Sequence, residues 1–163
     1  MNVAIVSDTH IPSRAARIPD AFRERISAAD HVLHAGDFDS EGALADQRDL
    51  APELTAVSGN MDPRVGLPAV ATAELGGVEF VVTHGTGSRR NYESRVAARA
   101  REEAASADPV AVVGHTHEVL DVVRDGIRIL NPGSATGAAP AKRTTVMTAT
   151  VADGDLSVTL HER

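Results

Sequence analysis

The sequence predicts an α/β (α+β) protein in which short buried strands alternate with helices before a β-rich tail. The apolar segments are short, rich in β-branched residues and bounded by Gly, Pro, Asp or Asn, as buried strands are. Stretches with helical spacing separate the early segments, which is typical of parallel strands joined by helical crossovers. The second half contains hairpin turns instead. We therefore expect a mixed sheet, or two packed sheets with helices outside.

The early strands and the helices follow one another in a regular order. The five predicted strands are Asn2–Ser7, His31–Ala35, Glu53–Val57, Glu79–Thr83 and Pro109–Val113. The three predicted helices are Pro19–Ser27, Ser40–Leu50 and Tyr92–Ala107. Ser40 is expected to cap the second helix, and Pro109 to stop the third. The order is β-α-β-α-β, then a hairpin, a helix and the β-rich tail.

The tail is predicted from alternating strands and turns. Its four strands are Val119–Arg124, Ile127–Leu130, Thr144–Val151 and Leu156–His161. Asp125-Gly126 and Asp153-Gly154-Asp155 are typical hairpin turns. Gly133–Pro140 has the loosest composition and is predicted to be a surface loop. The chain shows no internal repeat or linker, and its 163 residues fit one domain, so we expect a single domain over residues 1–163.

Composition excludes several classes of function. Lys and Arg number 16 against 23 Asp and Glu, and the net charge of −7 disfavours a surface that grips nucleic-acid phosphates. Aromatic residues make up 2%, too few for a platform on which bases stack, so no stable nucleic-acid partner is expected. The chain has no cysteine, as is usual for a cytoplasmic protein. Its apolar runs are too short to span a membrane.

Each of the five early strands ends at a residue that can bind a metal ion. In parallel α/β sheets the carboxyl ends of the strands share one edge, and ligands bind there. We therefore expect these side chains around one crevice: Asp8, His10, Asp37, Asn60, His84, His115 and His117. Taken singly, Asp and Asn also follow strands because they suit turns, so the prediction depends on the whole set.

The set offers two carboxylates, one amide oxygen and four imidazoles, without a thiolate. Such donors suit Mn²⁺, Fe²⁺, Co²⁺, Ni²⁺ or Zn²⁺. The donors are too many for one tetrahedral site but suffice for two ions that share a carboxylate, and ion pairs about 3.5–4 Å apart are typical of phosphoester cleavage. His115 and His117 stand roughly 6–7 Å apart along an extended backbone, so each ion can take one of them.

The motifs occur in the order found in a known family. Asp8-x-His10, Gly36-Asp37, Gly59-Asn60, His84 and Gly114-His115-Thr116-His117 resemble the motifs of the calcineurin-like metallophosphoesterases. The short length and Asn131-Pro132-Gly133-Ser134 are similar to the small YfcE-type phosphodiesterases of that superfamily. The resemblance covers about residues 1–134. It implies a sandwich of two mixed β-sheets flanked by helices, with the metal site at the carboxyl ends of the strands.

The resemblance also implies roles for the seven residues. Asp37 would bridge two divalent ions, with Mn²⁺ or Ni²⁺ favoured. Asp8, His10 and His117 would complete the shell of one ion. Asn60, His84 and His115 would complete the shell of the other. Asp37, Asn60 and His84 are then the expected catalytic residues, acting through metal-bound hydroxide on a small phosphodiester substrate.

One position departs from the pattern of the superfamily. Many members have a histidine directly after the third-motif Asn, thought to help protonate the leaving group, whereas Met61 follows Asn60 here. A thioether cannot transfer a proton. Small YfcE-type members also lack that histidine, so the difference supports the subfamily. Because no protein general acid is identified, we expect substrates with acidic leaving groups.

Two other functions are compatible with the resemblance. One retromer scaffold subunit is similar to this family yet acts by contacting partners, so a non-catalytic binding module on the same fold is an alternative. The complete set of seven donors argues against it. A cyclic-nucleotide phosphodiesterase is the second alternative. Small members of the family often pair, which makes a homodimer compatible with the sequence.

Several residues near the motifs have weaker assignments. His34 lies in the strand before Gly36-Asp37 and is expected to be a core histidine or to hold a ligand in place. Arg14, Arg89 and Arg90 follow ligand motifs and could hold a substrate phosphate, although solvated surface arginines are commoner. Asp39 and Asp62 are expected to support ligands or turns.

Overall fold

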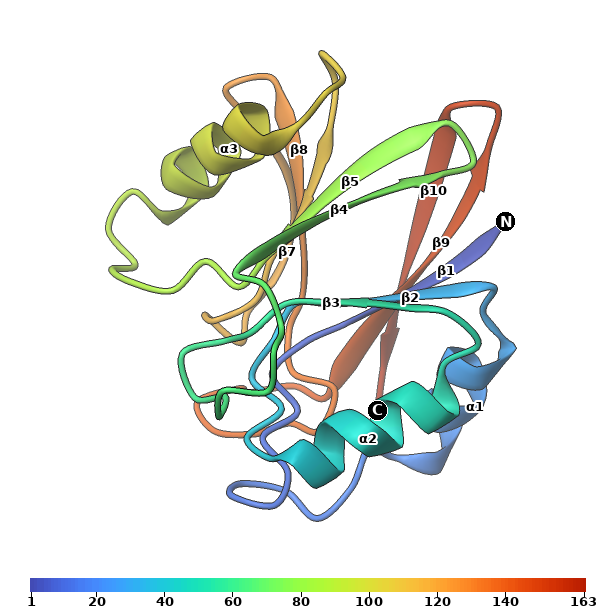
Figure 1. Ribbon diagram of the computed structural model, residues 1–163, viewed down its shortest axis with the longest axis vertical. Helices are drawn as coiled ribbons and strands as arrows, with labels where there is room; N and C mark the ends of the chain where they lie inside the picture. The colour runs from blue at the N-terminus through green and yellow to red at the C-terminus, as the bar shows by residue number, and fades with distance from the viewer.

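Two five-stranded β-sheets pack face to face in the computed structural model, which describes residues 1–163 (Figure 1). The first sheet has the order β10-β9-β1-β2-β3, from β1 (Asn2–Val6), β2 (His31–His34), β3 (Leu54–Ala56), β9 (Thr145–Ala152) and β10 (Asp155–Glu162). The second has the order β4-β5-β6-β8-β7, from β4 (Val70–Leu75), β5 (Val78–Thr83), β6 (Val110–Val112), β7 (Val119–Arg124) and β8 (Ile127–Pro132). Both sheets mix parallel and antiparallel pairs, which confirms the predicted architecture.

Three helices cover the outer faces of the sandwich. They are α1 (Asp20–Ala28), α2 (Glu41–Leu50) and α3 (Tyr92–Glu103). Helices α1 and α2 lie against the first sheet, and α3 lies against the second (Figure 1). None of these helices is long and apolar enough to cross a lipid bilayer.

Strand β1 shows why its apolar run does not alternate with polar residues. Val3 and Ile5 belong to the core between the two sheets, whereas Ala4 and Val6 pack with residues of α1 such as Phe22. Both faces of the strand are therefore covered, and every position of it after Asn2 is buried. A strand enclosed on both faces reads as a continuous apolar run.

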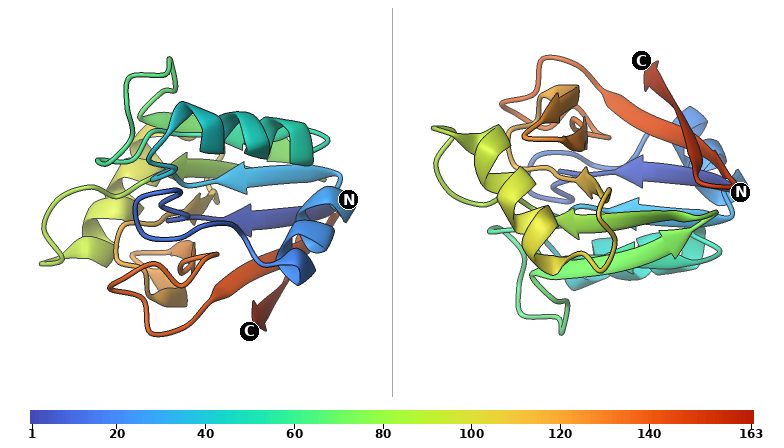
Figure 2. Two further views of the ribbon diagram at one scale, coloured as in Figure 1. Left: turned by 90° about the horizontal axis from the view of Figure 1, so that it is seen from below. Right: turned by 90° about the horizontal axis from the view of Figure 1, so that it is seen from above.

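The parallel strands bring their carboxyl ends to one end of the sandwich. Strand β1 pairs in parallel with β2, and β2 with β3, while β5 and β6 are parallel in the second sheet. The loops that follow these strands gather at the same end of the molecule (Figure 2). Backbone hydrogen bonds join these loops, with the amide of Asp8 donating to Gly36 and that of Gly114 to His84.

Helix α3 ends earlier than its sequence predicts. The expected end was Ala107, with Pro109 as the stop, but the helix ends at Glu103. The carboxylate of Glu79, on β5, accepts the backbone N–H groups of Ala105 and Ser106 at 2.9 and 2.6 Å. This contact across the fold turns the chain out of the helix before the proline is reached.

The prediction of a surface loop at Gly133–Pro140 is wrong for much of that segment. Ser134, Ala135 and Ala138 are buried. The hydroxyl of Ser134 donates to the carbonyl of Asp8 at 2.7 Å and accepts the N–H of Ala138 at 2.9 Å. The segment therefore packs beneath the loop that follows β1. The sequence predictions also give no range for β4, the first strand of the hairpin with β5.

The residue that caps α2 also joins the loop that follows β2 to the loop that follows β1. Ser40 accepts the N–H of Ala43 at 3.0 Å, as predicted, and donates its hydroxyl to the carbonyl of Ile11 at 2.9 Å. We expect Ser40→Ala to lower the free energy of unfolding by about 1–2 kcal/mol, because it loses a cap and a half-buried hydrogen bond. Urea unfolding measures this loss.

The matched control is Ser27→Ala, whose exposed hydroxyl bonds only to the carbonyl of Glu24 within α1. That variant should change the free energy of unfolding by less than about 0.5 kcal/mol. Equal losses in the two variants would contradict the role given to Ser40.

Candidate metal centre

The structure brings the seven predicted side chains into one connected cluster at the ends of five strands. Asp8 and His10 follow β1, Asp37 follows β2 and Asn60 follows β3. His84 follows β5, and His115 and His117 follow β6. Asp8, His10, Asp37, His84 and His117 are buried, while Asn60 is exposed and His115 is partly exposed.

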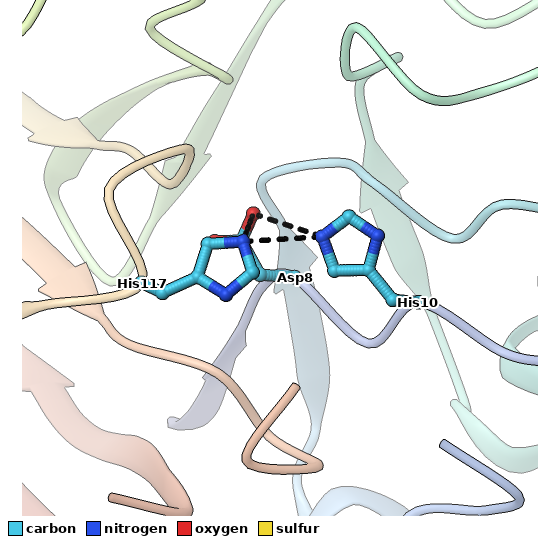
Figure 3. A group of neighbouring side chains, drawn as sticks. All are labelled: Asp8, His10 and His117. Carbon is cyan, nitrogen blue, oxygen red and sulfur yellow. Dashed lines mark hydrogen bonds and ion pairs between the residues drawn. The ribbon is translucent and has the colours of Figure 1, made fainter. Parts of the chain in front are cut away.

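The first half of the cluster contains Asp8, His10 and His117 (Figure 3). The Nε2 atoms of His10 and His117 lie 3.1 Å apart, and His117 Nε2 lies 3.4 Å from Asp8 Oδ1. His10 Nε2 is 3.9 Å from the same oxygen. Donors that share one cation at about 2.1 Å lie roughly 3.0–3.4 Å apart, so this half has nearly the spacing of a ligand set.

Asp37 lies between the two halves. Its Oδ2 is 3.5 Å from His10 Nε2 on one side and 3.1 Å from His84 Nε2 on the other. Its Oδ1 accepts the N–H of Met61 at 2.9 Å, which fixes the orientation of the carboxylate. This is the position that a carboxylate shared by two cations would occupy.

Asn60 and His115 form the outer half. Asn60 Oδ1 and His115 Nδ1 are 3.0 Å apart, and the rings of His84 and His115 lie edge to face at 5.3 Å. His115 Nε2 is 2.9 Å from the carbonyl of Gly87, which holds the ring proton on Nε2. Nδ1 therefore carries a lone pair toward the amide oxygen, so two acceptors face each other.

The other three histidines have the opposite tautomer. In each ring Nδ1 donates the hydrogen bond. His10 donates to Asp39 Oδ1 at 2.8 Å, His84 donates to the carbonyl of Ala35 at 2.7 Å, and His117 donates to the carbonyl of Ala138 at 2.8 Å. These acceptors direct each Nε2 into the cluster. His84 Nε2 is buried, has no hydrogen-bond partner and lies 3.1 Å from Asp37 Oδ2.

Lone pairs that face one another require a positive charge between them. Uncompensated buried acceptors cost free energy, and a divalent cation satisfies several at once. Imidazole and carboxylate donors without thiolate match the borderline divalent metals. The residues present thus fit one or more divalent cations, and they would supply Asp8, Asp37 and three buried histidines as the inner donors.

Backbone strain is concentrated at the cluster. Among the non-glycine residues with positive φ, six lie at the site: Asp8, His10, Asp37, Asp39, His115 and His117, with φ between 45° and 77°. Each such residue costs about 1 kcal/mol or more unless its surroundings fix it, and such residues gather at functional sites. All six residues lie in the loops that follow β1, β2 and β6.

Two glycines permit the close approach of the loops. A Cβ atom on Gly114 would lie 2.0 Å from Ser7 Oγ, and one on Gly59 would lie 2.0 Å from Asp37 Oδ1. Any larger residue would push the loops away from the carboxylates. The Gly36-Asp37, Gly59-Asn60 and Gly114-His115 motifs therefore combine a donor with the space that it needs.

The predicted supporting role of Asp39 and Asp62 is what the structure shows. Asp39 holds His10, while the carboxylate of Asp62 accepts four backbone N–H groups, those of Asp37, Phe38, Asp39 and Gly59. Because these amides belong to two separate loops, Asp62 ties the ends of β2 and β3 together.

Two further supporting residues were not predicted. Buried Asn131, on β8, donates to the carbonyl of Gly114 and to the hydroxyl of Thr116, both at 3.1 Å. Ser134 holds the carbonyl of Asp8, as described above. Both belong to the Asn131-Pro132-Gly133-Ser134 motif, which was the available signal. The motif positions the backbone of two donor loops.

The remaining assignments are also resolved by contacts. His34 is fully buried and stacks on Phe38 with ring centroids 3.8 Å apart, and its Nδ1 accepts the N–H of Gly36 at 3.1 Å, so it is a core histidine that also holds the loop before Asp37. Burial lowers the pKa of His34 to about 3. Arg89 donates to the carbonyl of Thr116 at 2.8 Å and pairs with Glu118, while Arg14 donates to the carbonyl of Ala139. Both arginines thus join loops around the cluster.

Burial and charge set the pKa values of the cluster. Burial raises the pKa of Asp8 to about 6 and lowers that of His117 to about 4. Burial opposes protonation of His84, but attraction by Asp37 and Asp8 outweighs it and raises the pKa of His84. Burial also favours a protonated Asp37, yet His84, the N–H of Met61 and His10 together outweigh that effect and lower the pKa of Asp37.

Comparison with known proteins gives one family. Residues 1–154 match the calcineurin-like phosphoesterase superfamily domain. A protein of Methanothermobacter thermautotrophicus named "probable metallophosphoesterase" is 33% identical over 138 residues, which are 83% of this chain and 78% of the relative. A protein of Methanocaldococcus jannaschii with the same name is 35% identical over 137 residues, which are 83% of this chain and 69% of the relative.

Solved structures share the whole fold. Vps29 of Entamoeba histolytica, in complex with Zn²⁺, matches with a TM-score of 0.78 and 26% identity over 100% of this chain and 98% of that chain. A structure described as a novel archaeal phosphodiesterase matches with a TM-score of 0.73 and 20% identity over 99% of this chain and 100% of that chain. The latter identity shows a common fold only.

Cation binding is expected to release protons near pH 6 and fewer near pH 8. The raised pKa values of Asp8 and His84 keep protons on these groups in the metal-free protein at about pH 6, and a cation must displace them. Affinity should fall about tenfold per pH unit for each proton displaced. Calorimetry with Mn²⁺ in buffers of different ionisation enthalpy counts the protons.

His161→Gln is the control for this measurement, because His161 bonds to Thr148 on a different part of the sheet. It should leave the proton count unchanged. The same affinity at both pH values, without proton release, would show that the cation binds elsewhere.

Proposed function

The chain belongs to the calcineurin-like phosphoesterase superfamily, and we propose that this member is a hydrolase of small phosphodiesters that works with two divalent cations. The observation that carries the proposal is the arrangement of acceptors around Asp37 Oδ2, which lies 3.5 Å from His10 Nε2 and 3.1 Å from His84 Nε2. Mn²⁺ or Ni²⁺ are the cations we favour. Zn²⁺, Fe²⁺ and Co²⁺ suit the same donors.

The side chains divide between the two proposed positions. Asp8, His10 and His117 would hold one cation, and Asn60, His84 and His115 the other, with Asp37 shared. When bound, two such cations supply a nucleophile at neutral pH and neutralise charge on the phosphoryl oxygens. The protein holds the donors in place beforehand, because every ring has a fixed acceptor on its other nitrogen.

The charge around the cluster favours an anionic substrate. In a chain of net charge −7, the loops at this end nevertheless carry several basic residues, namely Arg14, Arg64, Arg89, Arg90, Lys142 and Arg143. His117, Lys142 and Arg143 line a hollow of about 250 Å³ beside the cluster, together with Glu118, whose carboxylate pairs with Arg89. A space of this kind suits a small phosphodiester. The acidic surface elsewhere disfavours a polynucleotide.

The absence of a protein acid limits the leaving group. Met61, which follows Asn60, has 47% of its surface exposed and cannot transfer a proton. The Asn60 side chain hydrogen-bonds to His115, which belongs to the donor set. Diesters with acidic leaving groups should therefore be the best substrates, which supports aryl diesters as probes. Cyclic nucleotides remain candidates within the same class.

A partner-binding module is the competing function. The likeness to Vps29, whose name assigns it to vacuolar protein sorting, supports this alternative. Binding modules expose contiguous apolar patches. The exposed large apolar side chains here are Met1, Met61, Val123 and Leu160, which come from four separate elements. The complete donor set favours the enzyme.

We expect the protein with Mn²⁺ to hydrolyse bis-p-nitrophenyl phosphate, and Asp37→Asn to lower kcat by about 100-fold or more. Asparagine keeps the shape of the side chain but removes the charge that two cations would share. Release of p-nitrophenol measures the rate, and circular dichroism checks the fold. A chelator should stop turnover, and added Mn²⁺ should restore it.

Asp108→Asn is the matched control, because Asp108 is an exposed carboxylate before β6, away from the cluster. It should keep full activity. If folded wild-type protein turns over no phosphodiester with any divalent cation, the enzyme proposal is wrong and the partner-binding function is favoured instead.

A further inference from the structure

The guanidinium of Arg95 binds the backbone of the loop that follows His84. Arg95 lies in α3, and its guanidinium donates to the carbonyls of Thr86 at 2.8 Å, Gly85 at 3.0 Å and Ser88 at 2.9 Å. The same guanidinium lies 5.7 Å from the centre of the Tyr92 ring, a cation–π contact. Three carbonyls within four consecutive residues are thus fixed around one side chain.

The loop fits closely around Arg95. A Cβ atom on Gly87, where φ is +122°, would lie 3.6 Å from the central carbon of the guanidinium. A Cβ atom on Gly85 would lie 2.9 Å from the Tyr92 ring. These glycines let the backbone bend around the arginine and turn the carbonyl of Gly87 away from it.

That carbonyl determines the state of His115. It accepts the Nε2–H of His115 at 2.9 Å, and it is the only partner of that nitrogen. Nδ1 is therefore left with its lone pair, 3.0 Å from Asn60 Oδ1. The other three histidines of the cluster instead carry the proton on Nδ1, where a carboxylate or carbonyl accepts it.

We propose that Arg95 is a positioning residue that selects the Nε2–H tautomer of His115 through the carbonyl of Gly87 and so completes the outer cation position. The proposal rests on the two-cation function above. Arg95 does not touch the cluster. It acts through the loop Gly85–Ser88, whose backbone has no helix or strand to fix it.

An arginine is needed because of its shape. Its planar group carries five N–H donors in a fixed fork, so one side chain can bind several carbonyls at set angles. Lysine offers a single charged point on a flexible stem. Arg95→Lys should therefore keep the positive charge near the loop but not the direction of the Gly87 carbonyl.

The test uses the metal-free protein first, so that it does not depend on catalysis. Long-range ¹H–¹⁵N correlation spectra report which nitrogen of His115 carries the proton. The wild type should show the Nε2–H form. Arg95→Met should show a mixture or the Nδ1–H form, while the tautomers of His10, His84 and His117 stay unchanged. Arg95→Lys should lie between wild type and Arg95→Met.

Calorimetry with Mn²⁺ gives the second readout. Wild type should bind two cations. Arg95→Met should bind the cation at Asn60, His84 and His115 at least about tenfold more weakly, and it should keep its affinity for the cation at Asp8, His10 and His117. Arg99→Met is the control on the same helix, since Arg99 pairs only with Glu102 and Glu103. That variant should match the wild type in both measurements.

An unchanged His115 tautomer in folded Arg95→Met, with both cations bound at wild-type affinity, would overturn the proposal. Arg95→Lys keeps the charge and the aliphatic stem, so it gives an answer if Arg95→Met does not fold. Failure of the function proposed above looks different: wild type would bind two cations, with the tautomer shifted in Arg95→Met, yet would cleave no phosphodiester.

Discussion

The structure of the candidate metal centre depends on one constraint. Nitrogen and oxygen lone pairs face one another there without a proton between them. The Nε2 atoms of His10 and His117 are 3.1 Å apart, and each ring already donates its Nδ1 proton elsewhere. Such an arrangement is stable only with a positive charge among the acceptors. In the metal-free protein, burial raises the pKa of Asp8 to about 6, so below that pH this carboxyl carries a proton.

The fold holds this unfavourable cluster through contacts outside it. The sandwich core and the parallel strand pairs fix the ends of β1, β2, β3, β5 and β6, and supporting side chains then fix the loops. Asp62, Asn131 and Ser134 each hold backbone groups of the donor loops. The strained, left-handed residues persist because these contacts over-determine them. The geometry of the site is thus fixed by side chains such as Asp62, Asn131 and Ser134, which are not among the cation donors.

Local sequence patterns predicted the parts of the fold that local chemistry decides. The Ser40 cap, the Asp125-Gly126 and Asp153-Gly154 turns and the strand that precedes each donor all follow from neighbouring residues. The gathering of the donors at one end followed from the rule for parallel strands. Contacts across the chain decided the rest. Glu79, on β5, ends α3, and the burial of Ser134 depends on a hydrogen bond to the carbonyl of Asp8. No periodicity in the sequence contains such information.

The placement of Asp37 gives the most direct test of the proposed two-cation site. Anomalous diffraction from crystals grown with Mn²⁺ locates each cation without reference to activity. The account predicts two peaks about 3.5–4 Å apart, with the Asp37 carboxylate between them. A single peak among Asp8, His10 and His117, with Asn60 and His115 unengaged, would contradict it.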